Sequence, residues 1–274
     1  MTRKKILKVV YFVLAVLICA VVLFPIIWIV LSSFKGGYEI FDWPPHFFPK
    51  KFTIDNYISA FSKANFALYF KNSGIVTISS MIFAVIINFM AGYGFAKYEF
   101  KGRNTIFLIF IATLMLPLEV LMIPIFQTIK WFGMYNTFWG IIIPPAASPT
   151  GVFLVRQFFL SVPDELMDAA RIDGASEVQI LTKVMLPIAK PIISVLAIFN
   201  FMWRWNDYMW PLIVIRSSKL YTVQLALQTF AGEYTVDWNG LLSMSVITMI
   251  PVLIIFLIFQ KQFIQGIATS GLKE

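Results

Sequence analysis

The 274-residue chain is 59% hydrophobic and only 13% charged, with a mean hydropathy of +0.80. Soluble domains are about 25% charged, so this composition excludes an ordinary soluble fold and favours a membrane protein. The formal net charge of +8 comes from lysines and arginines scattered between apolar runs, which argues for contacts with lipid headgroups and against a nucleic-acid partner.

Six apolar segments are long enough to cross a bilayer as helices, which takes about 20 residues. In chain order they are residues 9–31, 73–95, 106–129, 137–159, 188–215 and 241–259. The first is too long for the apolar core of a secretory signal, about 7–15 residues, so we expect it to remain as a span. Gly92 and Gly94 in the second are expected to permit close helix packing. Pro144, Pro145 and Pro149 interrupt the fourth, a break that packed membrane helices tolerate.

The basic residues indicate how these spans are oriented. With the N-terminus in the cytoplasm, 13 of the 22 lysines and arginines lie inside and nine lie outside, five of those nine in one long loop, residues 33–71. In this orientation the short, densely basic loops all lie on the cytoplasmic side, as the positive-inside rule expects. The sequence therefore predicts an all-α, polytopic membrane protein with six transmembrane helices, both termini in the cytoplasm, and a single membrane domain over residues 1–274.

A cytoplasmic segment between the fourth and fifth predicted spans, residues 161–187, has the pattern of a helix–turn–helix. Ser161 followed by Asp164 resembles a capping box at the start of the first helix. Ser176 followed by Gln179 forms a second capping box at the start of the next helix. Two short, separately capped helices are therefore expected here, and we refer to residues 161–187 as the hairpin.

Two further residues shape the predicted hairpin. Gly174 permits a sharp turn between the two helices, because glycine adopts left-handed backbone conformations at little cost. Pro187 is expected to end the second helix and to start the next span. Capping and periodicity alone leave two interpretations open: a lever that transmits force, and an amphipathic hairpin that merely lies on the membrane.

The hairpin also carries a family resemblance. The run Asp168-Ala169-Ala170-x-x-Asp173-Gly174-Ala175, followed by Leu186-Pro187, resembles the EAA loop of ABC importer permeases. Flanking blocks occur in the family's order: residues 91–97, 136–137, 153–159, 205–207 with 210–212, and 251–260 with Gly266. Together they are similar to carbohydrate permeases of the maltose inner-subunit type over nearly the whole chain.

The resemblance implies that the hairpin is a coupling helix that docks into a cleft of a cytoplasmic ATPase subunit. It assigns ATPase coupling to Asp168, Ala169, Ala170, Asp173, Gly174, Ala175, Leu181, Leu186 and Pro187. Two positions depart from the family pattern. Asp168 replaces the usual glutamate and shortens its reach to a basic partner, and Leu181 replaces the usual phenylalanine, which should reduce packing in the ATPase cleft.

The resemblance further implies a permease subunit that imports a carbohydrate, such as a di- or oligosaccharide, across the cytoplasmic membrane of a bacterium or archaeon. Its implied partners are a second, different permease subunit, an ABC ATPase dimer, an extracytoplasmic solute-binding protein and membrane lipids. The chain has no G-x-x-x-x-G-K-[ST] phosphate loop and no catalytic constellation, so ATP and Mg²⁺ are expected in the ATPase and no cofactor in this chain. One cysteine and one histidine argue against a metal site.

Glu119 is the first candidate for the solute pathway, since it lies within the third predicted span. A carboxylate inside a membrane costs roughly 2.5 kcal/mol or more, so it should face the bundle interior or water. It could form hydrogen bonds with sugar hydroxyls, or it could pair with Arg204 or with free backbone groups. The sequence leaves both interpretations open.

A polar and aromatic run in the fifth predicted span supplies the other pathway candidates: Trp203, Arg204, Trp205, Asn206 and Asp207. Tryptophan faces stack on sugar rings, and the amide and carboxylate could bind hydroxyls. Tryptophan also gathers at bilayer interfaces without any ligand, and Arg204 and Asp207, three residues apart, could simply neutralise each other. Two rival functions also remain: import of another solute such as a glycerol phosphate, with Arg204 binding the anion, and secondary transport by this chain alone.

Overall fold

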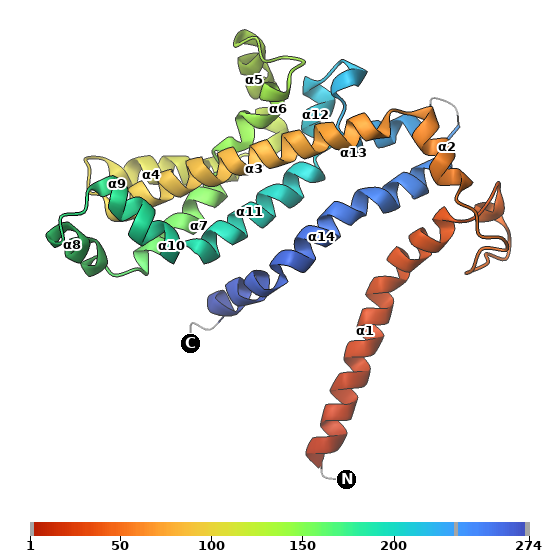
Figure 1. Ribbon diagram of the computed structural model, residues 1–274, viewed down its shortest axis with the longest axis horizontal. Helices are drawn as coiled ribbons and strands as arrows, with labels where there is room; N and C mark the ends of the chain where they lie inside the picture. Colours follow the sequence, from red (N-terminus) through yellow and green to blue (C-terminus); the bar gives the residue numbers. More distant parts are fainter. Residues whose placement is uncertain (1–2, 233–234, 272–274) are drawn as a thin grey trace. The chain divides into compact units, whose positions relative to one another are not determined.

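Helices form the regular structure of the protein, of which the computed structural model describes residues 3–232 and 235–271 (Figure 1). None of these described residues lies in a strand, so the all-α prediction is confirmed. The helices are α1 (Arg3–Ser33), α2 (Asp55–Lys63), α3 (Phe66–Lys97), α4 (Arg103–Ala112), α5 (Leu118–Trp131), α6 (Phe138–Ile142), α7 (Pro149–Leu160), α8 (Glu165–Ile172), α9 (Glu177–Gln179), α10 (Leu186–Ile188), α11 (Lys190–Trp205), α12 (Met209–Val214), α13 (Val223–Leu227) and α14 (Trp238–Gly271). A π-helix, Ile180–Met185, links α9 to α10, and short 3₁₀ helices occupy Glu39–Phe41, Thr113–Met115, Pro144–Ala146, Ser218–Leu220 and Gln228–Phe230.

Three helices are long and apolar enough to cross a membrane unbroken: Leu7–Ser33, Phe66–Lys97 and Trp238–Gln260. Three further pairs of helices reach that length only together, because each is bent at a short break. The described residues therefore supply three to six spans, with six if every bent pair is one crossing. The count of six and the cytoplasmic placement of both termini stay predictions.

The third predicted span, residues 106–129, is not one helix. The chain breaks at Leu116, and the helices on either side, Arg103–Met115 and Leu118–Trp131, meet at 111°. Leu116 is extended (φ −87°, ψ 125°), as the ring of the following Pro117 disfavours the helical conformation in the residue before it. The prediction of a continuous helix here is wrong.

The fourth and fifth predicted spans are interrupted as well. In the fourth, a 40° bend separates α6 from α7, and the Ser148 hydroxyl caps α7 by accepting a hydrogen bond from the Gly151 N–H at 3.2 Å. The fifth, predicted over residues 188–215, consists of α11 and α12 with a break between them. The side chain of Asp207 accepts from the Trp210 N–H at 3.3 Å and so begins α12. A single helix over 188–215 is wrong for this reason.

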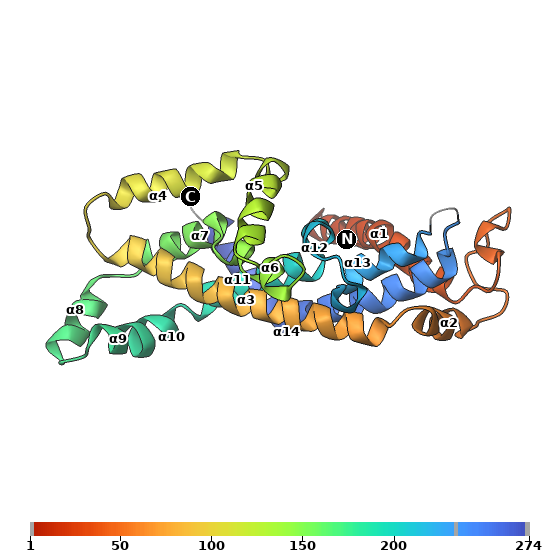
Figure 2. The same cartoon turned by 90° about the horizontal axis from the view of Figure 1, so that it is seen from above.

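The chain is divided into two compact units, Met1–Ala67 with Ala226–Ile250, and Leu68–Leu225 with Pro251–Glu274. In the second unit α3, α4, α7 and α11 run alongside one another, and α8, α9 and α10 lie at one end of them (Figures 1 and 2). That end contains the hairpin. The proposed single membrane domain over residues 1–274 stays a prediction.

Two apolar cores hold the second unit together. The core beneath the hairpin contains Phe89, Tyr93, Val155, Phe159, Met167, Ile180 and Met185. The other contains Val76, Ile129, Ile141, Trp210, Val214 and Leu225 and joins α5, α6 and α12 to α3. The Trp210 indole N–H donates to the Gly140 carbonyl at 3.0 Å, which satisfies its one polar atom inside that core.

A close approach between α3 and α7 depends on Gly92. A Cβ atom at this position would lie 2.5 Å from Val155 Cβ and 2.9 Å from the Val152 carbonyl oxygen, both on α7. At Gly94, two residues further along α3, a Cβ would meet no atom within 4 Å. The prediction that glycine permits close packing is therefore confirmed for Gly92 and wrong for Gly94.

We expect Gly92→Ala to destabilise the protein by about 1–3 kcal/mol, because the added methyl group overpacks a contact that includes rigid backbone. Gly94→Ala is the matched control on the same helix and should be neutral or stabilising by up to about 1 kcal/mol. Thermal unfolding of both variants in the same detergent measures the difference. Equal midpoints for Gly92→Ala and the unmodified protein would show that α3 and α7 are not in tight contact.

Candidate coupling site

The hairpin consists of α8, a turn at Gly174, and a second arm made of α9, the π-helix Ile180–Met185 and α10. Gly174 has a φ of +82°, a left-handed conformation that glycine adopts without steric cost. The turn is closed by two backbone hydrogen bonds, from the Gly174 N–H to the Arg171 carbonyl at 3.0 Å and from the Ala175 N–H to the Ala170 carbonyl at 2.9 Å. The predicted sharp turn is confirmed.

One of the two predicted capping boxes is present. Ser176 Oγ accepts from the Gln179 N–H at 3.4 Å, and Gln179 Oε1 accepts from the Ser176 N–H at 2.8 Å. The Ser161–Asp164 box is wrong, because Ser161 Oγ donates to the Phe158 carbonyl at 2.7 Å. Asp164 makes no side-chain cap bond, and its carboxylate instead accepts from the ammonium of Lys97.

The second arm does not end at Pro187 as predicted. The helix continues through α10, which contains Pro187, and the chain bends by 75° at Ala189 before α11 begins. A proline ring would clash with the carbonyl four residues earlier in a regular α-helix, and it lacks the N–H to continue the ladder. The wider π-helical turn before Pro187 leaves room for the proline ring and does not need its missing N–H. The bend therefore comes two residues after Pro187.

The inner face of the hairpin is built into the core of the second unit. Met167 of α8 and Ile180 and Met185 of the π-helix are buried against side chains of α3 and α7. Aromatic rings form the floor: Phe159 lies 5.1 Å from Tyr93 and 5.5 Å from Phe89 between ring centroids. Burial of this face fixes the hairpin to the ends of α3 and α7.

Two polar side chains at the end of α3 reinforce that attachment. The side chain of Lys97 is only 3% exposed, and its ammonium donates hydrogen bonds to the Val162 carbonyl and the Asp164 carboxylate just before α8. The Tyr98 hydroxyl donates to the Glu177 carboxylate at the start of the second arm. Each arm of the hairpin is therefore tied to α3 by its own charge-assisted hydrogen bond.

Arg171 joins the two arms to each other. Its Nε donates to Glu177 Oε1 at 2.8 Å and its Nη1 donates to Asp168 Oδ1 at 3.0 Å. Arg171 and then Tyr98 hold the pKa of the Glu177 carboxyl below its usual value, while burial and the bond to Glu177 raise the pKa of Tyr98. Because the pKa of Glu177 is lowered on folding, its contribution to stability is present above the unfolded pKa and is lost only in acid. The network therefore holds across neutral pH.

The outer face of the hairpin is exposed and combines apolar with acidic side chains. Ile172, at the end of α8, is 86% exposed although it is a large apolar residue. Other exposed residues of the hairpin include Glu165, Leu166, Asp168, Ala169, Asp173 and Val178, together with Arg171, which pairs with Asp168 and Glu177. An apolar tip surrounded by carboxylates, held rigidly by the opposite face, is suited to insertion into a pocket of another protein.

The comparisons with known proteins identify the kind of protein that carries this hairpin. Residues 84–269, more than half of the chain, match the family described as binding-protein-dependent transport system inner membrane component. The chain belongs to this family. Permeases of this family work with ATPase subunits, and the matched region contains the whole hairpin.

Curated relatives and a solved structure support the same assignment over the full length of this permease. It is 37% identical to the arabinooligosaccharides transport system permease protein AraQ of Halalkalibacterium halodurans, covering 93% of both chains. It is 32% identical to the sn-glycerol-3-phosphate transport system permease protein UgpE of Salmonella typhi, covering 92% of both. A solved chain of a bacterial ABC transporter involved in the import of the acidic polysaccharide alginate has a TM-score of 0.85 and 25% identity, covering 95% of the permease and 98% of that chain.

The predicted coupling residues divide into two groups in the permease. Asp168, Ala169, Asp173, Gly174, Leu186 and Pro187 are exposed, whereas Ala170, Ala175 and Leu181 are partly buried against the core beneath the hairpin. Leu181 packs in part against the core beneath the hairpin, and its role in ATPase coupling stays a prediction. Sequence reasoning missed Ile172, although a helical wheel places it well away from the buried Met167.

The pathway candidates are dispersed. Glu119 is exposed in the first turn of α5, where a negative charge is favoured by the helix dipole, and it does not pair with Arg204. Arg204 donates to Asp207 at 2.8 Å instead, so the expectation of mutual neutralisation is confirmed. Trp205 is only 4% exposed and stacks on Phe201 at 5.9 Å, which corrects its assignment to a solute pathway.

Trp203 and Asn206 are exposed, and their place in a solute pathway stays a prediction. Asn206 lies in the break between α11 and α12, where its side-chain oxygen Oδ1 accepts a hydrogen bond from Gln224 Nε2 at 3.4 Å. Within the described residues no cluster of three His, Cys, Asp or Glu side chains is placed to bind a metal ion.

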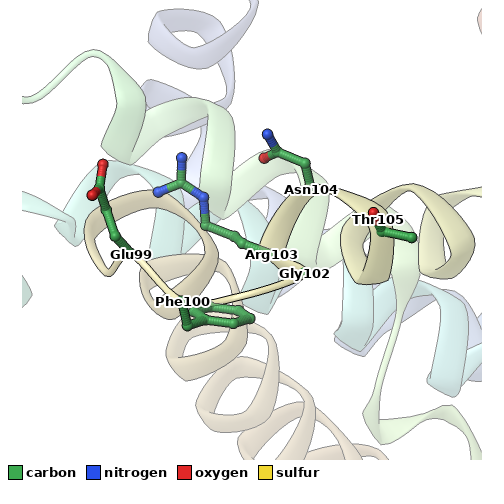
Figure 3. A pocket seen from close by; sticks show the side chains of 6 residues that line it. All are labelled: Glu99, Phe100, Gly102, Arg103, Asn104 and Thr105. Carbon is green, nitrogen blue, oxygen red and sulfur yellow. The ribbon is translucent and has the colours of Figure 1, made fainter.

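A pocket of about 550 Å³ lies next to the attachment of the hairpin, in the turn between α3 and α4 (Figure 3). It is lined by Glu99, Phe100, Gly102, Arg103, Asn104 and Thr105. Glu99 and Arg103 project to the same side of the turn, and Phe100 points away from them. Arg103 donates to the Tyr98 carbonyl at 3.2 Å, so this turn also braces the residue that holds the second arm.

Proposed function

We propose that the permease imports a carbohydrate, a di- or oligosaccharide, across the cytoplasmic membrane and draws its energy from ATP and Mg²⁺ in a partner ABC ATPase dimer. The other proposed partners are a second, different permease subunit and an extracytoplasmic solute-binding protein. The observation that supports this best is the hairpin, whose outer face is exposed and apolar at Ile172 while its inner face is fixed to α3 and α7.

The attachment of the hairpin suggests how it acts as a lever. Closure of the ATPase dimer would displace the exposed tip, and the hydrogen bonds from Lys97 and Tyr98 would transmit that displacement to the end of α3. Because α3 is a 32-residue helix of the second unit, a movement at one end shifts the whole element. The spans would then alternate between outward-open and inward-open states.

The relatives favour a sugar as the solute. The AraQ relative is named for arabinooligosaccharides, and the solved structural relative takes part in alginate import. An anion such as glycerol 3-phosphate is the second candidate, because UgpE is also similar over nearly the whole chain. Arg204 was the sequence-based reason for an anion, but its charge is balanced by Asp207, which removes that reason. Glu119, Trp203 and Asn206 remain as accessible pathway candidates.

The choice of solute is tested with the complete transporter, its ATPase and its binding protein in proteoliposomes that contain ATP. We expect uptake of labelled oligosaccharide that unlabelled oligosaccharide competes away and that glycerol 3-phosphate does not affect. Uptake of glycerol 3-phosphate with no uptake of any oligosaccharide would overturn the proposed solute class. The ATPase assay on the same vesicles reports coupling separately from the identity of the solute.

A further inference from the structure

The chain between α1 and α2, in the first unit, contains a short loop rich in proline and aromatic residues (Figure 1). Its sequence is Trp43-Pro44-Pro45-His46-Phe47-Phe48-Pro49, and we refer to residues 43–49 as the aromatic finger. Polar contacts close its base: Lys50 Nζ pairs with Asp42 Oδ2 at 2.6 Å, and the Lys50 N–H donates to Glu39 Oε1 at 2.6 Å. The finger is thus an apolar loop with a charged base.

The finger runs back along α1 instead of projecting beyond its end. The ring of Phe47 lies 5.9 Å from the ring of Phe24 and 5.9 Å from that of Trp28, measured between centroids. Phe24 precedes the last residue of α1, Ser33, by nine positions, which at 1.5 Å per residue is about 13 Å along the helix axis. The finger therefore overlaps the final turns of α1.

This overlap places the ring of Phe47 at the depth of the hydrocarbon. The apolar helix Leu7–Ser33 has 27 residues, and crossing the hydrocarbon core of a bilayer takes about 20. Any continuous stretch of that length within this helix includes Phe24, wherever the helix sits along the membrane normal. A ring stacked on Phe24 then lies below the level of the headgroups.

The backbone of the finger limits how deeply it can enter the membrane. Hydrocarbon offers no hydrogen-bond partners, so backbone polar groups there must be absent or satisfied within the protein. Three of the seven residues are proline and carry no N–H, but the N–H groups of Trp43, His46, Phe47 and Phe48 have no hydrogen-bond acceptor among the described residues, so the backbone suits the level of the headgroups and only the rings suit the hydrocarbon. The His46 carbonyl accepts a hydrogen bond from Lys35 Nζ at 2.6 Å, and the ammonium of this lysine, a residue only 1% exposed, lies 4.3 Å from the centre of the Trp28 ring.

The remaining side chains point away from the protein. Trp43 is 91% exposed and Phe48 is 65% exposed, while Lys50 and Lys51 at the base are exposed and basic. Tryptophan and phenylalanine lower their free energy at the boundary of headgroups and acyl chains, and nearby lysines contact the headgroups. In water the same two rings would be an exposed apolar patch with no compensating contact.

We infer that the aromatic finger inserts into the membrane leaflet beside the C-terminal end of α1, with lipid acyl chains packing on Trp43 and Phe48. In the orientation proposed above this is the outer leaflet. The insertion anchors the segment between α1 and α2 to the bilayer independently of solute and of ATP. In the alternative case, Trp43 and Phe48 pack against the binding protein or the second permease subunit instead of against lipid. The experiment distinguishes these cases.

The test uses the complete transporter in nanodiscs, with the single native cysteine removed by Cys19→Ala. One variant carries Phe48→Cys and the matched control carries Lys51→Cys, both labelled with the same environment-sensitive fluorophore. We expect lipids brominated on the acyl chain to quench the label at position 48 at least threefold more than the label at position 51. Iodide dissolved in the water should quench the label at position 51 more than the label at position 48.

Equal or stronger iodide quenching at position 48, or a label there that bromolipid does not reach, would overturn the insertion. Protection from iodide that requires the binding protein would overturn it as well, since that protein would then be the occupant. Trp43→Cys is the second variant should Phe48→Cys not fold, and the same quenching order is expected for it. None of these readouts depends on transport, so a failed insertion is distinguishable from a failed assignment of function.

Discussion

Lys97→Met is expected to uncouple the transporter while leaving the permease in the membrane and folded. The substitution keeps the length and apolar stem of the side chain and removes the ammonium that binds Val162 and Asp164. The Val162 carbonyl loses its donor, and a charge-assisted hydrogen bond of this kind contributes about 1.5–3 kcal/mol. That corresponds to about a 10- to 100-fold smaller preference for the attached position of the first arm. ATP-driven uptake should fall about tenfold or more.

Lys101→Met is the matched control, because Lys101 carries the same charge four residues further on and is exposed in the turn before α4. Uptake and ATP hydrolysis by both variants are measured in proteoliposomes together with the amount of permease recovered in the complex. A Lys97→Met permease that transports as well as Lys101→Met would contradict the assignment of Lys97 to the lever.

Ile172→Glu is expected to prevent docking of the ATPase. Ile172 is the most exposed large apolar residue of the hairpin, so the substitution costs little in the isolated permease. Buried in an ATPase pocket, an added carboxylate would have to be desolvated next to the carboxylate of the adjacent Asp173. A well-packed apolar anchor at an interface typically accounts for 2 kcal/mol or more, so we expect at least about a 30-fold loss of affinity.

The conservative variant Ile172→Leu retains the apolar contact and should retain docking. Co-purification of the ATPase with the tagged permease, followed by solute-stimulated ATP hydrolysis, measures both variants. If Ile172→Glu retained the ATPase in full, the exposed face of α8 would not be the docking surface. This test is cleaner than Asp168→Lys, since Asp168 also pairs with Arg171 and its replacement would disturb the turn itself.

Local features of the hairpin could be predicted from the sequence because their partners are close in the chain. The Ser176–Gln179 box and the turn at Gly174 each depend on residues within a few positions. The Ser161–Asp164 box failed because the Ser161 hydroxyl bonds to the Phe158 carbonyl and because Lys97, 67 residues before Asp164, takes the carboxylate of Asp164. Nothing in a single sequence indicates that this lysine becomes buried beneath the hairpin.

The spans show the same limit. Hydropathy located the three unbroken apolar helices but could not show where the other segments bend, since the 111° break at Leu116 and the 75° bend at Ala189 depend on how proline is accommodated. Trp205 was chosen as a pathway residue for its chemistry, yet its burial against Phe201 is a tertiary contact. Gly94 looked equivalent to Gly92 because the sequence does not show which face of α3 meets α7.

The central claim is that this permease transports solute only when an ATPase acts on its hairpin. The most direct measurement is uptake into proteoliposomes that contain the permease with its partners, compared with and without internal ATP and with and without an imposed ion gradient. We predict uptake that requires internal ATP and the ATPase, and that is lost in Ile172→Glu. Uptake driven by an ion gradient, by the permease without any ATPase, would contradict this account.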